Sequence, residues 1–141
     1  MEKLPDKLSE LIRVGLADMR AVEKLPKMYA VDMGNWHRPD AESEKCSVCL
    51  AGAAMSITLG VEPTSNAYPH QFGENEASLR ALNCCAWGDP GDIPEALGEL
   101  GVNEDEANKW RNTTHCRYEE DRELFRDQLG QIADELEAAG Y

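Results

Sequence analysis

Five cysteines and three histidines give this chain the thiolate and imidazole ligands of a zinc site. Cys46 and Cys49 have the spacing of a zinc knuckle, in which thiolate and imidazole ligands surround the ion as a tetrahedron. A zinc ribbon needs a second such pair on a turn, whereas Cys84 and Cys85 fall within a helical pattern. We therefore expect no cofactor, with a zinc-stabilised structural domain as the alternative. The candidate zinc ligands are Cys46, Cys49, His115 and Cys116.

The same cysteine pair also suggests nucleophilic chemistry. A helix N-terminus stabilises a thiolate, and the pair stands at the start of an uncharged run that predicts a helix. Cys46 or Cys49 would then be the nucleophile, and one of the three histidines, His37, His70 or His115, would be the base. No spacing brings a histidine to the pair, and buried thiols commonly just fill core space. A Cys-dependent enzyme is therefore an alternative, and no catalytic residue is assigned.

Trp36, His37 and Trp110 suggest a site for a small molecule. Aromatic side chains that carry a polar atom offer a ligand both apolar contact and a hydrogen bond. Tryptophans of a small helical domain also serve as core or rim residues, which is the competing interpretation. A small-molecule-binding protein that uses the Trp36-His37 and Cys46-Cys49 region is thus an alternative function.

The charge of the chain is strongly and unevenly negative. Its 27 acidic and 14 basic residues give a formal charge of −13, and residues 74–106 carry nine acids with Arg80 as their only base. Direct binding of nucleic acid is not expected, because lysine and arginine make the phosphate contacts. An acidic row of this kind is either a solvated face or a surface for a basic protein. The predicted interaction residues are Asp92, Glu95, Glu99, Glu104, Asp105 and Glu106.

The fold is predicted to form around a buried central helix, residues 46–60, which carries no charged residue. A helix that is apolar on nearly every face must be enclosed by other elements. Apolar residues at spacings of three and four predict amphipathic helices over 6–25, 74–86 and 118–139, which would enclose it. Residues 28–33 alternate as in a short strand. We expect a mainly α fold, with α+β as the alternative and at most a small strand pair.

At 141 residues the chain is predicted to be a single compact domain, residues 1–141. Its first residues contain no apolar signal run, and its longest uncharged stretch is too short to span a bilayer. We therefore expect a cytoplasmic protein that does not bind a membrane.

Three short motifs carry a resemblance to known sequences. They are Cys49-Leu-Ala-Gly-Ala, Ala81-Leu-Asn83 and Trp110-Arg-Asn112, in that order. The layout resembles short phage and bacterial proteins with a C-L-x-G-A helix, a later A-L-N helix and a W-N turn before the last helix. The resemblance implies a phage or mobile-element setting and no particular activity.

The sequence thus favours a non-enzymatic interaction protein. We expect it to bind a host protein with a basic surface, in the manner of a nucleic-acid mimic or an anti-defence protein. The alternatives are the small-molecule binder or Cys-dependent enzyme and the zinc-stabilised domain described above.

Overall fold

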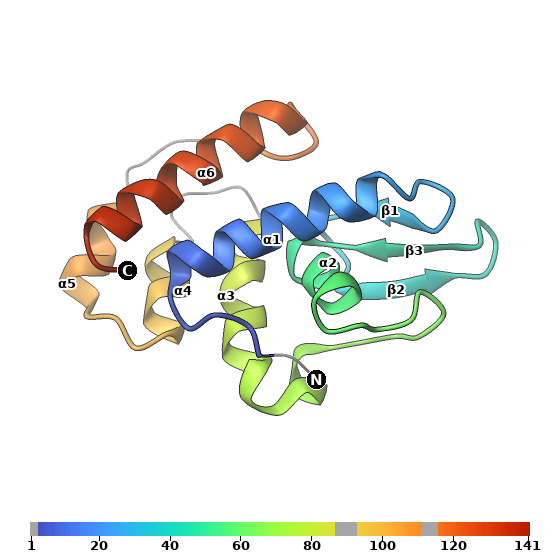
Figure 1. The fold of residues 1–141 in the computed structure, drawn as a ribbon, viewed down its shortest axis with the longest axis horizontal. Helices are drawn as coiled ribbons and strands as arrows, with labels where there is room; N and C mark the ends of the chain where they lie inside the picture. Colours follow the sequence, from blue (N-terminus) through green and yellow to red (C-terminus); the bar gives the residue numbers. More distant parts are fainter. Residues whose placement is uncertain (1–2, 87–92, 111–115) are drawn as a thin grey trace.

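The structure, a computed structural model, describes residues 3–86, 93–110 and 116–141. A small sheet lies at one end, short helices lie at the other, and a long helix connects the two ends (Figure 1). The predicted mainly α fold is confirmed. The elements are α1 (Leu8–Glu23), β1 (Tyr29–Val31), β2 (His37–Asp40), β3 (Lys45–Val48), α2 (Leu50–Ile57), η1 (Pro69–Asn75), α3 (Glu76–Ala86), α4 (Ile93–Glu99), α5 (Glu104–Ala107), η3 (Asn108–Trp110) and α6 (Arg122–Ala138).

Helix α1 is the element around which the others are arranged. It packs against α2, α3, α6 and β1, and Figure 1 shows α6 on one side of it and α2 and α3 on the other. Most of its apolar stripe is buried, as the spacing of three and four predicts, and Leu16 is partly buried. Gly15 allows the closest approach, because a Cβ there would lie 2.8 Å from the Leu82 side chain.

The predicted central helix is buried but shorter than expected, because its first residues form strand β3. Cys46 and Val48 face the core while Ser47 is half-buried, so the period in this segment is two. Helix α2 follows, with every residue from Leu50 to Ser56 buried. Strand β3 is short and directly precedes the apolar helix within the uncharged run, which is why the sequence pattern predicted one long helix.

The sheet has three strands in the order β1-β3-β2, which corrects the expected strand pair. Strand β1 runs parallel to β3, and β2 runs antiparallel to it. The turn between β2 and β3 is held by Asp40, whose carboxylate accepts hydrogen bonds from the Glu42 amide and the Ser43 hydroxyl. The sequence pattern missed β2 because it contains Pro39, which is tolerated there since β2 is an edge strand.

The C-terminal helix α6 packs along α1, and this corrects the prediction that it encloses the central helix. Its buried stripe includes Phe125, Leu129 and Leu136, which occupy the predicted amphipathic positions. The core around α2 is completed instead by the sheet, α1 and α3. Of the described helices, none is both long and apolar enough to cross a membrane.

Candidate functional site

Strands β2 and β3 bring His37 and Cys46 together in the interior. His37 Nδ1 lies 2.7 Å from the Ser65 carbonyl oxygen and 3.4 Å from Cys46 Sγ. A carbonyl oxygen only accepts, so Nδ1 carries the proton and donates to Ser65. Burial lowers the pKa of His37, which keeps the ring neutral, and raises the pKa of Cys46 to about 11. The pair therefore holds a thiol, and no thiolate nucleophile is generated at neutral pH.

Cys49 is the N-cap of α2, where its sulfur accepts a hydrogen bond from the Gly52 amide at 3.4 Å. The sequence argument expected this position to lower the pKa of the thiol. Burial instead raises the pKa of Cys49 to about 11, because desolvation outweighs the hydrogen bonds at the helix start. The role of Cys49 in the described structure is to cap the helix.

Gly52 explains the spacing of the Cys49-Leu-Ala-Gly motif. A Cβ at this position would lie 1.7 Å from the Trp36 carbonyl oxygen, which is far too close for any residue with a side chain. The start of α2 therefore sits directly on the backbone that leads into β2. The motif reports close packing between the helix and the sheet.

An open hollow lies beside this packed region, on the side of Trp36. It encloses about 640 Å³, within the range of roughly 300–1,000 Å³ that small-molecule sites occupy. Two predicted ligand-binding residues, Trp36 and His37, line it, and Arg38 is its only charged lining residue because His37 is neutral. The side chain of Trp110, the third, falls outside what the structure describes. The lining residues are Gly34, Asn35, Trp36, His37, Arg38, Asn66 and Tyr68.

The candidate zinc ligands are not brought together by the described part of the chain. Within residues 3–86, 93–110 and 116–141, no group of three or more His, Cys, Asp or Glu side chains could hold a metal ion. Cys46 adjoins His37, Cys49 caps α2, and Cys116 Sγ donates to the Asp121 carbonyl at the start of α6. His115 lies outside the described residues.

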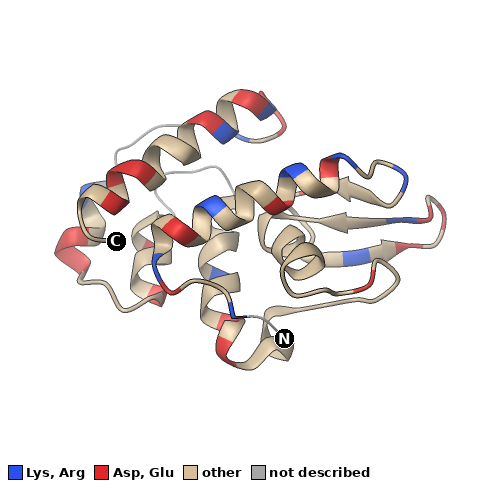
Figure 2. Ribbon diagram, in the orientation of Figure 1, with Lys and Arg blue, Asp and Glu red and all other residues tan. Residues whose placement is uncertain are grey.

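The predicted interaction residues gather at the end of the molecule opposite the sheet (Figure 2). We call this surface the acidic end and define it by Glu95 and Glu99 on α4 and Glu104, Asp105 and Glu106 on α5. Four of the five side chains are exposed, and Glu106 pairs with Lys109 at 2.6 Å. Asp92, the sixth predicted residue, lies outside the described part of the chain.

An ionic cluster between α1 and α6, centred on the buried Arg126, has no counterpart among the predicted sites. Arg126 donates to Glu23 and also to Glu123, the latter at 2.6 Å, and the Tyr118 hydroxyl donates to Glu23 at 2.6 Å. Burial opposes ionisation of Glu23, but the hydrogen bonds from Arg126 and Tyr118 hold its pKa below the ordinary value. No sequence signal indicates this cluster, because Glu23 and Arg126 are 103 positions apart.

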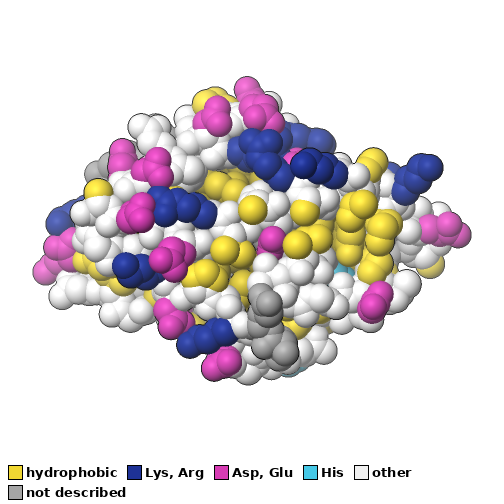
Figure 3. All heavy atoms as spheres, viewed as in Figure 1, with side chains coloured by type: hydrophobic (Ala, Val, Ile, Leu, Met, Phe, Trp, Pro, Cys, Tyr) yellow, Lys and Arg dark blue, Asp and Glu magenta, His cyan; other side chains and the backbone are white. Residues whose placement is uncertain are grey.

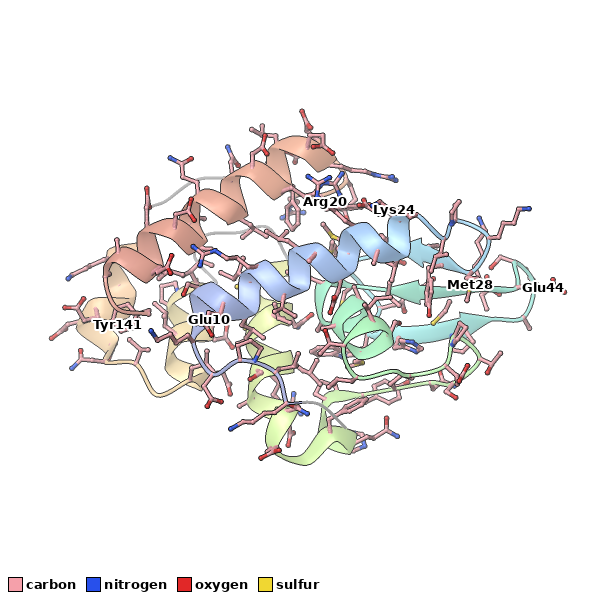
Figure 4. All side chains as sticks on the ribbon, in the orientation of Figure 1. Glu10, Arg20, Lys24, Met28, Glu44 and Tyr141 are labelled. Carbon is pink, nitrogen blue, oxygen red and sulfur yellow. The ribbon has the colours of Figure 1, made fainter. Side chains whose placement is uncertain are left out.

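The two ends of the molecule differ in the side chains that they present. In Figure 3, hydrophobic side chains gather toward the sheet end, while acidic and basic side chains alternate over the helical end. Glu44, at the tip of the β2–β3 turn, and Tyr141, beside the acidic end, mark the two extremes in Figure 4.

No protein-family model, curated protein or solved structure matches the chain.

Proposed function

We propose that this protein is a non-enzymatic binding module whose acidic end contacts a basic surface on a partner protein. The observation that carries the proposal is the charge of residues 93–110, which hold five acids and one lysine. Four of these acids are exposed on two consecutive short helices, so a partner can reach them together. Complementary charge of this kind steers association and makes it sensitive to salt.

The pairing of acids elsewhere supports this choice of surface. On α6, Asp134 and Glu137 share Arg13 as a partner, at 2.7 and 2.8 Å. On α3, Glu76 pairs with Arg80 at 2.9 Å. Acids that are already paired within the chain offer less free charge to a partner. In the described part of the acidic end, one of the five acids, Glu106, forms such a pair. The other four carboxylates can therefore contact a partner.

The kind of partner follows from the charge and from the resemblance to phage proteins. A row of carboxylates can occupy a groove that evolved to hold nucleic-acid phosphates. In a phage setting the partner would be a basic, nucleic-acid-binding host protein in the cytoplasm, and the binding would block its groove.

The test reverses charge at the acidic end and compares it with an equal reversal elsewhere. The protein is used to capture partners from host lysate, and the captured protein is then purified and titrated at several salt concentrations. Reversal of the acidic end is expected to abolish binding, and the control is expected to weaken it only a few-fold, since both variants change the net charge equally. The test variant carries lysine at Glu95, Glu99, Glu104 and Asp105, and the control carries lysine at the exposed Glu10, Glu74, Asp127 and Glu135.

Two results would contradict the proposal. One is equal loss of binding in both variants, which would mean that net charge alone drives capture. The other is unchanged affinity in the test variant, which would make the acidic end a solvated face. Circular dichroism and thermal unfolding of both variants show whether each one keeps its fold.

A further inference from the structure

The hollow beside Trp36 is lined by a basic residue although the chain as a whole is acidic. The protein carries a formal charge of −13, yet the only charged side chain lining this hollow is Arg38. Arg38 is exposed and forms no ion pair with any residue that the structure describes. An arginine with free donors at the mouth of a concave site favours an anion, because its guanidinium can bind two oxygens side by side.

Asp40, two positions further along β2, forms no ion pair with Arg38 in the described part of the chain. Asp40 lines a second hollow of about 410 Å³, which shares Asn35 and Arg38 with the first. Its two carboxylate oxygens are turned toward its own turn, where they accept from the Glu42 amide at 3.0 Å and the Ser43 hydroxyl at 3.1 Å. These hydrogen bonds hold the pKa of Asp40 below its ordinary value, and the positive charge of Arg38 contributes to the same shift without forming an ion pair.

The other lining residues suit a flat, polar ring. Trp36 and Tyr68 contribute aromatic side chains, and Asn66 contributes an amide that can both donate and accept hydrogen bonds. The Asn35 amide nitrogen already donates to Asp32 at 2.8 Å, which leaves its oxygen as an acceptor. Tyr68 is 45% exposed, and its ring stacks on His70 with centroids 6.0 Å apart. The His70 ring therefore lies parallel to the Tyr68 ring and offset from it.

Hydrogen bonds hold one wall of the hollow against strand β2. The segment that carries Asn66 and Tyr68 is fastened to β2 at two points, both on His37. The His37 ring donates to the Ser65 carbonyl at 2.7 Å, and the His37 carbonyl accepts from the Ala67 amide at 3.1 Å. The Tyr68 amide in turn donates to the Gln71 side chain at 2.8 Å. A preformed site loses less conformational entropy when it binds a ligand.

We propose that the hollow beside Trp36 binds a small anion that carries a flat ring, with the anionic group on Arg38 and the ring beside Tyr68. A nucleoside monophosphate has this chemistry and is the probe for the test. The site lies at the sheet end, away from the acidic end, so it is independent of the function proposed above.

The test is a titration of the whole protein with AMP, followed by chemical shifts in two-dimensional NMR spectra. Saturable binding is expected, with the largest shifts at the amides of Asn35, Arg38, Asn66 and Tyr68. Adenosine, which lacks the charge, and inorganic phosphate, which lacks the ring, are each expected to bind at least about tenfold more weakly. Arg38→Met is expected to weaken AMP binding at least about tenfold and to leave adenosine binding unchanged.

Lys45→Met is the matched control. It removes one positive charge from the same sheet, at the position paired with Asp40, from a residue that does not line the hollow. It is expected to change AMP affinity less than about twofold. The proposal is overturned if AMP gives no saturable shifts, if phosphate alone binds as tightly as AMP, or if the two variants lose affinity equally.

Discussion

Two junctions hold this molecule together, and they use opposite chemistry. The sheet junction, formed by Trp36, His37, Cys46, Cys49 and Gly52, contains no charged group. The helix junction, formed by Glu23, Tyr118, Glu123 and Arg126, is built from charges and their hydrogen bonds.

The difference shows what each junction tolerates. At the sheet junction the fit is steric, since backbone meets backbone where α2 starts, and an added methyl group has nowhere to go. At the helix junction the fit is electrostatic, and removal of one partner leaves the other desolvated without compensation. A substitution at the sheet junction should destabilise the protein by adding volume. A substitution at the helix junction should destabilise it by removing a charged partner.

The largest expected effect is at Gly52. Gly52→Ala should lower the free energy of unfolding by about 3 kcal/mol or more, because the new Cβ would lie 1.7 Å from the Trp36 carbonyl oxygen. Urea unfolding measures the loss. Gly130→Ala in α6 is the control, since a Cβ there meets nothing within 4 Å, and it should stabilise the protein by up to about 1 kcal/mol. A stable Gly52→Ala protein would mean that α2 does not start against Trp36.

Arg126→Met should have the next largest effect, a loss of about 2–3 kcal/mol, because Glu23 then keeps only its hydrogen bond from Tyr118. The double variant Glu23→Gln, Arg126→Met should recover about half of this loss, since it removes the unpaired charge. Urea unfolding of the two single variants and the double variant gives the coupling energy. Additive losses would show that the junction depends on packing and not on charge.

The smallest effect concerns the pH dependence of the sheet junction. Burial lowers the folded-state pKa of His37, so the unfolded chain takes up its proton first as the pH falls. Stability should therefore decrease as the pH drops below about 6.5, the ordinary value for histidine. Thermal unfolding between pH 7.5 and 5.5 should show a weaker slope for His37→Gln than for the wild type. His70→Gln, at an exposed position, should keep the wild-type slope.

Much of the helical part follows from sequence periodicity. Helices α1 and α6 lie within their predicted ranges because each has a long apolar stripe with polar residues opposite. The cap of α5 was also predictable, since Asn103 accepts from the Asp105 amide as an N-cap residue should.

The sheet junction was less accessible to sequence reasoning. Strand β3 has only four residues, which is too short for its alternation to stand out beside the apolar helix that follows. The contact between His37 and Cys46 depends on the pairing register of β2 and β3, and a register is not visible in a single sequence. The sequence shows that residues 74–106 are rich in acids. That the acids of α4 and α5 lie together at one end of the molecule is visible only in the folded structure.

The distance along the chain between the partners of the helix junction has a consequence for synthesis. Glu23 and Arg126 are 103 residues apart, and a ribosome that adds roughly 5–20 residues per second needs about 5–20 s to cover this interval. Throughout that time the side of α1 that packs on α6 has no cover from α6. Nascent chains should therefore bind a holdase chaperone that recognises exposed apolar stretches. The chaperone should be released when α6 emerges from the ribosome.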